Sequence, residues 1–271
     1  MKILVTGATG LVGSRLLPRL VEDGHDCRTL VRRRGAASGD VTEVVGDLSD
    51  AESLTPAVSG VDAIVHLAAV FRTSDTELIW TTNRDGSCSL IAAAQEHAPD
   101  ARFIMASTAH VYGAECARPG REDDEVDPGH PYPASKLAAE NALRSSGLTW
   151  TIQRYGFVYG DGDGHLDALP GQAANADMHP AQRMSLIHHR DVAAATRLAL
   201  TGAFDGRIVN ITDEAPTSVY ELVAIAGGDM GSSARPLEHP WHLQMDGALA
   251  RRLGFRPALR TVYHAVEQQA M

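Results

Sequence analysis

Lysine is almost absent from this chain of 271 residues: of its 24 basic residues, only Lys2 and Lys136 are lysine and all the others are arginine. Positive charge as a whole is also in deficit, because 34 acidic residues give a formal net charge of −10 at pH 7. Nucleic acids and anionic membrane surfaces attract basic proteins. We therefore expect no nucleic acid and no membrane as the main partner of this protein.

Cysteines are few, and long apolar runs are missing. The three cysteines, at positions 27, 88 and 116, are odd in number and lack metal-ligand spacing, and the histidines at 179, 188 and 189 show no zinc spacing. No apolar run reaches the length of about 18 residues that marks a membrane span, and the N-terminus reads as a strand rather than a signal peptide. These absences predict a cytoplasmic protein without a metal site.

The sequence does contain the pattern of an α/β protein. Hydrophobic residues make up 44% of the chain and charged residues 21%, which is ordinary for a globular domain. Short apolar runs alternate with helical patterns, which predicts a parallel, doubly wound sheet. Residues 166–182 read as irregular, and the last thirty residues show no clear pattern. The expected strands are residues 2–6, 27–31, 41–45, 62–69, 102–106, 149–154 and 207–211.

A glycine-rich turn joins the first strand to the first helix. Gly7, Gly10 and Gly13 lie three residues apart, between strand 2–6 and a helix that extends to about Glu22. Glycines in this context let the backbone approach a pyrophosphate at the helix N-terminus. The turn therefore predicts a bound dinucleotide.

Three arginines follow the second strand, where a dinucleotide-binding sheet meets the adenine ribose. An acidic residue there would bind the ribose hydroxyls of NAD, but this chain has Val31 and then Arg32, Arg33 and Arg34. A guanidinium suits a 2′-phosphate in charge and geometry. We predict that NADP(H) is favoured, with Arg32 at the phosphate, and that NAD(H) is the alternative. The competing interpretation is a solvated basic loop.

Tyr132 and Lys136 lie four residues apart in a stretch that reads as the start of a helix, so one helical face carries both. A neighbouring ammonium favours the phenolate and is expected to lower the pKa of the tyrosine from about 10. Such a tyrosine can move a proton to or from an alcohol or a carbonyl. The competing interpretation is a surface pair that shares a face by chance.

Other strands end in residues that suit a ligand. Asp47 follows strand 41–45, where its carboxylate can accept a hydrogen bond from the adenine amine. Ala68 and Ala69 leave room for a cofactor, and strand 102–106 brings Thr108 to the carboxyl edge of the sheet, where ligands bind in open α/β folds.

Several motifs occur together in a fixed order: residues 6–13, 46–48, 66–69, 83–86, 107–113, 132–136, 154–160 and 188–193. As a set they resemble the extended short-chain dehydrogenase/reductase family, in its NAD(P)-dependent epimerase/dehydratase branch. The resemblance implies a Rossmann fold with a small C-terminal substrate lobe. Residues 1–160, completed by about 185–214, would bind the dinucleotide, and residues 161–184 and 215–271 would form the lobe.

The resemblance also implies roles for single residues. Thr108 would hydrogen-bond the reacting oxygen, Tyr132 would be the acid/base, and Lys136 would bind the nicotinamide ribose. The family often forms homodimers through the helix at 84–97 and the helix that carries Tyr132. The implied cofactor-binding residues are Gly7, Thr9, Gly10, Leu11, Val12, Arg32, Asp47, Leu48, Leu67, Ala68, Ala69, Tyr132, Lys136, Tyr155 and Val158.

Three departures from the family pattern bear on the substrate. Ala109 and His110 replace the Asp-Glu pair of the dehydratases, which disfavours a 4,6-dehydratase. Met184 stands where nucleotide-sugar enzymes often have an arginine, and Arg183, one residue away, is expected on the other face of the strand. Tyr155 stands where the family usually has proline.

The predicted function is an NAD(P)-dependent oxidoreductase. It would transfer hydride between the nicotinamide and a ketone or alcohol of a small or sugar-like metabolite, with Tyr132 as the acid/base. One alternative is a nucleotide-sugar 4-epimerase with tightly bound NAD. Another is a cofactor-sensing protein without catalysis on the same fold.

Overall fold

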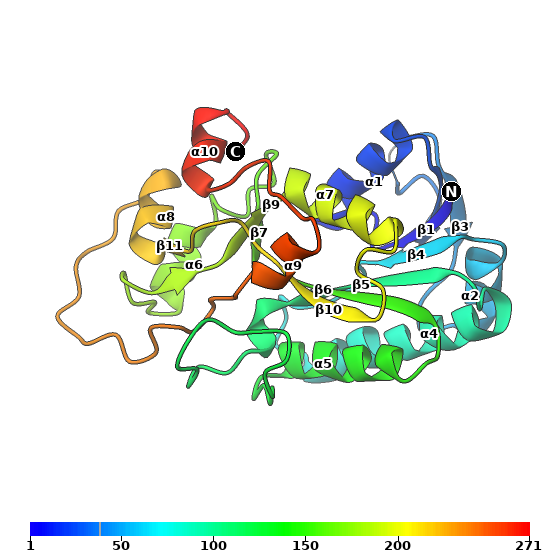
Figure 1. The fold of residues 1–271 in the computed structure, drawn as a ribbon, viewed down its shortest axis with the longest axis horizontal. Helices are drawn as coiled ribbons and strands as arrows, with labels where there is room; N and C mark the ends of the chain where they lie inside the picture. The colour runs from blue at the N-terminus through cyan, green and yellow to red at the C-terminus, as the bar shows by residue number, and fades with distance from the viewer. Residues whose placement is uncertain (38) are drawn as a thin grey trace.

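The centre of the molecule is a seven-stranded sheet in which every pair of neighbours is parallel (Figure 1). The protein is represented by a computed structural model, which describes residues 1–37 and 39–271. The order β10-β6-β5-β4-β1-β2-β3 reverses direction between β1 and β4, so the predicted doubly wound Rossmann fold is confirmed. The strands are β1 (Lys2–Thr6), β2 (Asp26–Val31), β3 (Thr42–Val45), β4 (Ala63–His66), β5 (Arg102–Thr108), β6 (Thr149–Tyr155) and β10 (Arg207–Ile211).

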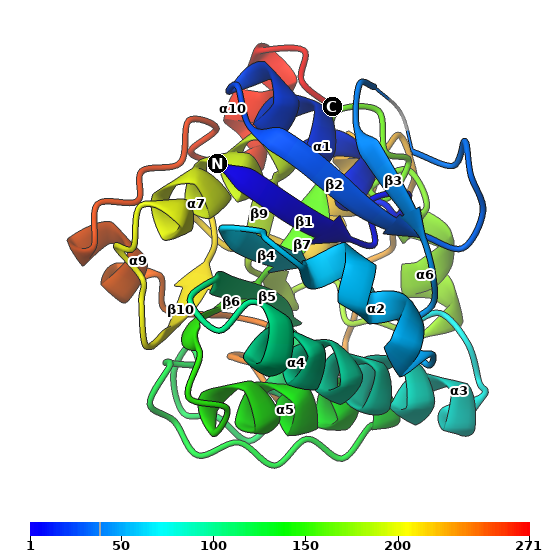
Figure 2. The same ribbon diagram turned by 90° about the vertical axis from the view of Figure 1, so that its right-hand side faces the viewer.

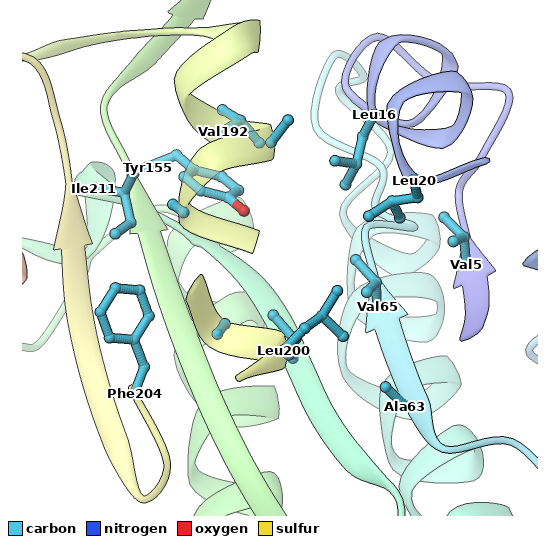
Figure 3. Close-up of a cluster of buried hydrophobic side chains, with 14 of the residues drawn as sticks. Val5, Leu16, Leu20, Ala63, Val65, Tyr155, Val192, Leu200, Phe204 and Ile211 are labelled. Carbon is cyan, nitrogen blue, oxygen red and sulfur yellow. The ribbon is translucent and has the colours of Figure 1, made fainter. Parts of the chain in front are cut away.

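Helices cover both faces of this sheet (Figure 2). One layer holds α2 (Ala51–Val58), α4 (Gly86–His97) and α5 (Pro131–Arg144), and the other holds α1 (Gly13–Glu22) and α7 (His189–Leu200). Figure 3 shows Leu16, Leu20 and Val192 of the second layer in one buried cluster with Val65 of β4. All four residues of β4 are buried, as expected for a strand that is covered on both faces. Within the described residues, no helix has the length and apolar character needed to cross a membrane.

An irregular helical segment precedes β5. It consists of α3 (Thr76–Trp80), a π-helical turn at Thr81–Asp85, and α4. Asn83 lies in that turn with its side chain buried, and its amide group donates to the Val70 carbonyl at 2.8 Å and to Ser135 Oγ at 3.1 Å. This side chain ties the loop after β4 to α5, and the irregular turn thereby positions the helix that carries Tyr132.

Smaller elements pack beside the carboxyl end of the main sheet. They are β7 (Phe157–Tyr159) paired with β9 (Leu186–His188), β8 (Arg183–Met184) paired with β11 (Thr217–Ser218), and the helices α6 (Leu169–Asn175), α8 (Val219–Ile225), α9 (Ala248–Arg252) and α10 (Val262–Glu267). Most of these elements share a hydrophobic core of their own that includes Leu169, Leu222 and Val262. Two expectations are corrected here, because residues 166–182 contain α6 and the last thirty residues contain α9 and α10.

Candidate active site

A cavity of about 670 Å³ lies between the carboxyl ends of the central strands and the smaller elements. Such a crevice at the switch point of a doubly wound sheet is the usual ligand site of the fold. Eleven of the predicted site residues line it: Gly7, Gly10, Leu11, Val12, Leu67, Ala69, Thr108, Tyr132, Lys136, Tyr155 and Val158. The remaining predicted residues, Thr9, Arg32, Asp47, Leu48 and Ala68, are not part of this lining.

The glycine-rich turn is too tight for side chains. Gly7 has φ of 71°, and a Cβ atom there would lie 2.6 Å from the backbone nitrogen of Ala68. A Cβ atom at Gly13 would lie 2.2 Å from the carbonyl oxygen of Gly7. Both glycines are therefore needed to bring β1, α1 and the end of β4 together. The turn that results presents backbone at the cavity wall, as a pyrophosphate site requires.

Thr108, Tyr132 and Lys136 share one wall of the cavity. Thr108 is the last residue of β5 and is 6% exposed. The helix α5 presents the other two one turn apart, with Lys136 2% exposed and Tyr132 half-buried. Pro131 at the first helical position fixes the start of α5, which determines where both side chains lie.

Burial dominates the electrostatics of these groups. It raises the pKa of Tyr132 to about 12, although a hydrogen bond with the Thr108 side chain favours the phenolate. It lowers the pKa of Lys136 to about 8, although the charge of Glu140 opposes this shift. The sequence predicted a lowered pKa for Tyr132. That prediction is wrong for this structure, because desolvation of the Tyr132 phenol outweighs its hydrogen bond with Thr108.

A buried polar network supports the wall from behind. Glu140, one turn after Lys136, accepts hydrogen bonds from Arg154 at 2.7 Å and 3.1 Å and from the Ser107 hydroxyl. Arg154 also donates to the Tyr112 hydroxyl at 3.1 Å. Each of these charged groups is nearly inaccessible, so each depends on its partner for neutralisation. Sequence reasoning missed this network; its one local signal is the four-residue spacing of Lys136 and Glu140.

His66 supports the glycine-rich turn in the same way. Its Nδ1 lies 2.7 Å from the Thr6 hydroxyl, and its Nε2 lies 2.8 Å from the Ser87 hydroxyl. Complete burial and the charge of Lys136 lower the pKa of His66 to about 3, so the ring is neutral. It links β1, β4 and α4 beneath the cavity without reaching it.

Comparison with known proteins identifies the family. Residues 3–212 match the model of the NAD dependent epimerase/dehydratase family. The chain belongs to this family. The family predicted from the motifs is thereby confirmed, and with it the enzyme superfamily of short-chain dehydrogenases/reductases.

Two curated members of this family illustrate its range. The chain is 31% identical over 200 residues to a ceramide reductase of Caulobacter vibrioides, which covers 71% of this chain and 58% of that protein. It is 34% identical over 173 residues to a UDP-glucose 4-epimerase of Azospirillum brasilense, which covers 59% of this chain and 49% of that protein. The matches thus span about half the length of these two relatives.

Among solved structures, a short-chain dehydrogenase/reductase superfamily protein from Agrobacterium tumefaciens with bound NAD has a TM-score of 0.81. It is 24% identical in sequence, and the alignment covers 99% of this chain and 95% of that one. This likeness confirms the fold.

In the present protein, the residues predicted for the adenine side of the cofactor lie on exposed loops or in the core. Arg32 is exposed after β2; hydrogen bonds from Ser49 lower the pKa of Asp47, and the Arg32 charge adds a smaller effect. The Asp47 carboxylate accepts from the Ser49 backbone at 2.9 Å and from the Ser49 hydroxyl at 2.7 Å. Leu48 is buried against Gly86, where a Cβ atom would lie only 2.8 Å from the leucine. These contacts determine the shape of the loop after β3.

Tyr155 belongs both to the cavity lining and to the hydrophobic core. It contributes to the cavity lining, but its side chain lies in the core against Val192 (Figure 3). Its hydroxyl donates to Gln153 Oε1 at 2.6 Å. The polar end of this side chain is therefore occupied inside the core.

The far wall of the cavity comes from the smaller elements. On β8, Met184 is 7% exposed and faces the cavity, whereas Arg183 is exposed and donates to the Pro216 carbonyl at 3.1 Å. The expectation that these two residues lie on opposite faces is confirmed. Within residues 1–37 and 39–271, no cluster of three or more side chains suits a metal ion.

Proposed function

We propose that this protein is an NADP(H)-dependent oxidoreductase that reduces a ketone to a secondary alcohol, or catalyses the reverse oxidation. The observation that carries the proposal is that Thr108, Tyr132 and Lys136 line the same cavity as the glycine-rich turn. That turn has no room for side chains at Gly7 and Gly13. When bound, the nicotinamide supplies or accepts the hydride. The ceramide reductase of Caulobacter vibrioides is a relative with a reductase activity.

The chain's own residues supply the proton. Tyr132 donates its phenolic proton to the carbonyl oxygen as hydride reaches the carbonyl carbon, and the resulting phenolate recovers a proton from solvent. A phenol with a pKa of about 12 is protonated at neutral pH, which suits the direction of reduction. Thr108 hydrogen-bonds the same oxygen, and Lys136 binds the nicotinamide ribose and stabilises the phenolate.

We propose that Gly7, Gly10, Leu11 and Val12 contact the pyrophosphate and that Arg32 contacts the 2′-phosphate of NADP(H). Support comes from the exposed cluster of Arg32, Arg33 and Arg34 at the end of β2 and from the absence of an acidic residue at Val31. The Agrobacterium tumefaciens protein contains NAD, so NAD(H) is the alternative cofactor.

A binding titration on nucleotide-free protein tests the cofactor. We expect NADP(H) to bind at least about tenfold more tightly than NAD(H), a difference of about 1.4 kcal/mol. The variant Arg32→Ala should lose most of this preference, and Arg33→Ala and Arg34→Ala serve as matched controls in the same loop. Tighter binding of NAD(H) would contradict the proposal.

The second candidate function is nucleotide-sugar 4-epimerisation with tightly bound NAD. The UDP-glucose 4-epimerase of Azospirillum brasilense favours it, because the identity to that relative reaches 34%. An epimerase regenerates its cofactor in each cycle, whereas a reductase consumes it. Cofactor that co-purifies with the protein, without net change in absorbance during turnover, would favour the epimerase.

We further propose that the chain is divided into a cofactor-binding part and a substrate-binding part. Residues 1–160, completed by about 185–214, bind the cofactor, and residues 161–184 and 215–271 form the substrate lobe. The separate hydrophobic core around Leu222 supports this division.

We also propose a cytoplasmic homodimer that associates through α4 and α5, which lie side by side in one outer layer (Figure 2). Sedimentation equilibrium tests the dimer; a monomer at micromolar concentration would contradict it.

A further inference from the structure

Five apolar side chains gather on the part of the cavity wall beyond Tyr132. Phe71 comes from the loop after β4, Leu169 from α6, Met178 from the loop after α6, Met184 from β8, and Leu243 from the loop before α9. Four separate segments of the smaller elements thus converge with one loop of the main sheet. We call these five residues the apolar wall.

Phe71 brings the apolar wall to the proton donor itself. Its ring centroid lies 5.6 Å from that of Tyr132, although 46% of the Phe71 surface remains exposed. The Arg72 guanidinium lies 5.0 Å from the same ring. Covering an exposed aromatic ring of this size with another apolar group is favourable, because apolar surface is removed from water.

Two polar groups on the same side of the cavity, Ser185 and His165, are already bonded to the protein. Ser185 Oγ accepts from the Met245 backbone at 2.9 Å. His165 Nδ1 bonds the Val158 carbonyl at 2.7 Å, and its ring stacks on Phe157 at 4.1 Å. Burial lowers the pKa of His165, so this ring carries no charge at neutral pH.

Positive charge for an anionic substrate is scarce here. Apart from Lys136, the one Lys or Arg side chain among the described lining residues is Arg72, which is exposed at the mouth. Arg183 faces away from the cavity and is bonded to Pro216. A diphosphate placed against the apolar wall would lose its hydration without gaining ion pairs, which is costly.

We propose that the substrate is a ketone whose carbonyl carbon carries a hydrocarbon or aryl group, and that it is not a nucleoside diphosphate sugar. This inference rests on the proposed function. The carbonyl oxygen meets Thr108 and Tyr132, and the apolar group packs on the apolar wall. Hydride adds to the carbonyl carbon, the Tyr132 proton adds to the oxygen, and a secondary alcohol and NADP⁺ are formed. The two methionines let the wall adapt to groups of different shape.

The test measures binding without turnover. Full-length Tyr132→Phe protein, saturated with NADP⁺, is titrated by calorimetry with 2-acetylnaphthalene as the apolar ketone and with UDP as the nucleotide. We expect the ketone to bind at least about tenfold more tightly than UDP. Tighter binding of UDP, or no binding of the ketone at about 1 mM, would overturn the inference.

A charge placed in the wall provides the second arm. Met184→Arg, made in the same background, should weaken ketone binding at least about tenfold. Tyr220→Arg adds the same charge on the exposed surface of α8 and should leave ketone binding unchanged. Equal ketone affinity of Met184→Arg and its parent would overturn the inference. If Met184→Arg no longer binds NADP⁺, Leu243→Arg replaces it.

Failure of the proposed function looks different. If the unsubstituted enzyme binds 2-acetylnaphthalene and NADPH but oxidises no NADPH with any ketone, the proposed function is wrong while the apolar binding site stands. If it reduces polar sugar ketones and does not bind the apolar ketone, the proposed function stands and the present inference is wrong.

Discussion

At the residue scale, the most distinctive group of the candidate site is the Lys136 ammonium, because burial lowers its pKa. Lys136 is 2% exposed, and burial lowers its pKa although the charge of Glu140, which is bonded to Arg154, opposes this shift. Thr108, Tyr132 and Lys136 could be predicted as a group because each lies in a recognisable motif. Arg154 and His66 could not be assigned their supporting roles, because their partners are 14 or more residues away and meet them only in the fold.

The pKa of Lys136 predicts the pH dependence of reduction. Because the pKa is lowered from 10.5 to about 8, the ammonium is present below about pH 8 and is lost as the pH rises through that value. Tyr132 stays protonated over the same range, since its pKa is about 12. We therefore expect kcat/KM for ketone reduction to fall above about pH 8.

The variant Lys136→Arg tests whether Lys136, rather than another group, causes the decline of kcat/KM above about pH 8. A guanidinium stays charged across the accessible range, so the variant should lose the decline above about pH 8 even if its activity is lower throughout. A decline at the same pH in the variant would assign this titration to another group and contradict the account.

At the element scale, local patterns identified the regular pieces and tertiary packing determined the others. The glycine turn and α1 are where the sequence predicts them, because glycine spacing and helical periodicity act locally. The short helix α6 was missed, because Pro170, Gly171 and Asn175 are poor helix formers. It persists because Leu169 and Ala173 are buried in the core of the smaller elements.

The glycine turn permits a matched comparison of two substitutions. Gly7 and Gly24 both have positive φ, at 71° and 82°, but a Cβ atom at Gly24 would meet nothing within 4 Å. Gly24→Ala should therefore cost only the conformational strain of about 1–2 kcal/mol. Gly7→Ala should cost at least about 2 kcal/mol more, because the backbone of Ala68 must move, a steric cost of the kind seen in overpacked sites.

Urea unfolding measures the stability of both variants, and a titration with NADPH measures their cofactor affinity. Weakened NADPH binding is expected only for Gly7→Ala. Equal losses of stability in the two variants would show that the close approach of β1 and β4 is not what the glycine serves.

At the scale of the whole molecule, one buried amide joins the main sheet to two distant loops. Asn210 of β10 donates to the carbonyls of Gly120 at 3.0 Å and Asp246 at 3.1 Å, and it accepts from the Tyr112 hydroxyl at 2.6 Å. The loop at 246 continues from Leu243 of the apolar wall. Contacts between segments this far apart could not be predicted from a single sequence, whereas the alternation of strands and helices could.

Asn210→Ala should release both loops. We expect faster hydrogen exchange at residues 118–122 and 244–247, together with a loss of stability of about 1–3 kcal/mol, because the Asp246 carbonyl and the Tyr112 hydroxyl donor lose their partner. The exposed Asn141→Ala on α5 is the control and should change neither region. Unchanged exchange in both loops would show that the amide does not hold them.

The most direct test of the account is the rate of NADPH oxidation by the enzyme and by Tyr132→Phe with the same ketone. Removal of a positioned proton donor typically costs 10²–10⁴-fold in rate. We predict a loss of at least about 100-fold with NADPH affinity retained. A Tyr132→Phe variant that keeps full activity would contradict the claim that Tyr132 delivers the proton.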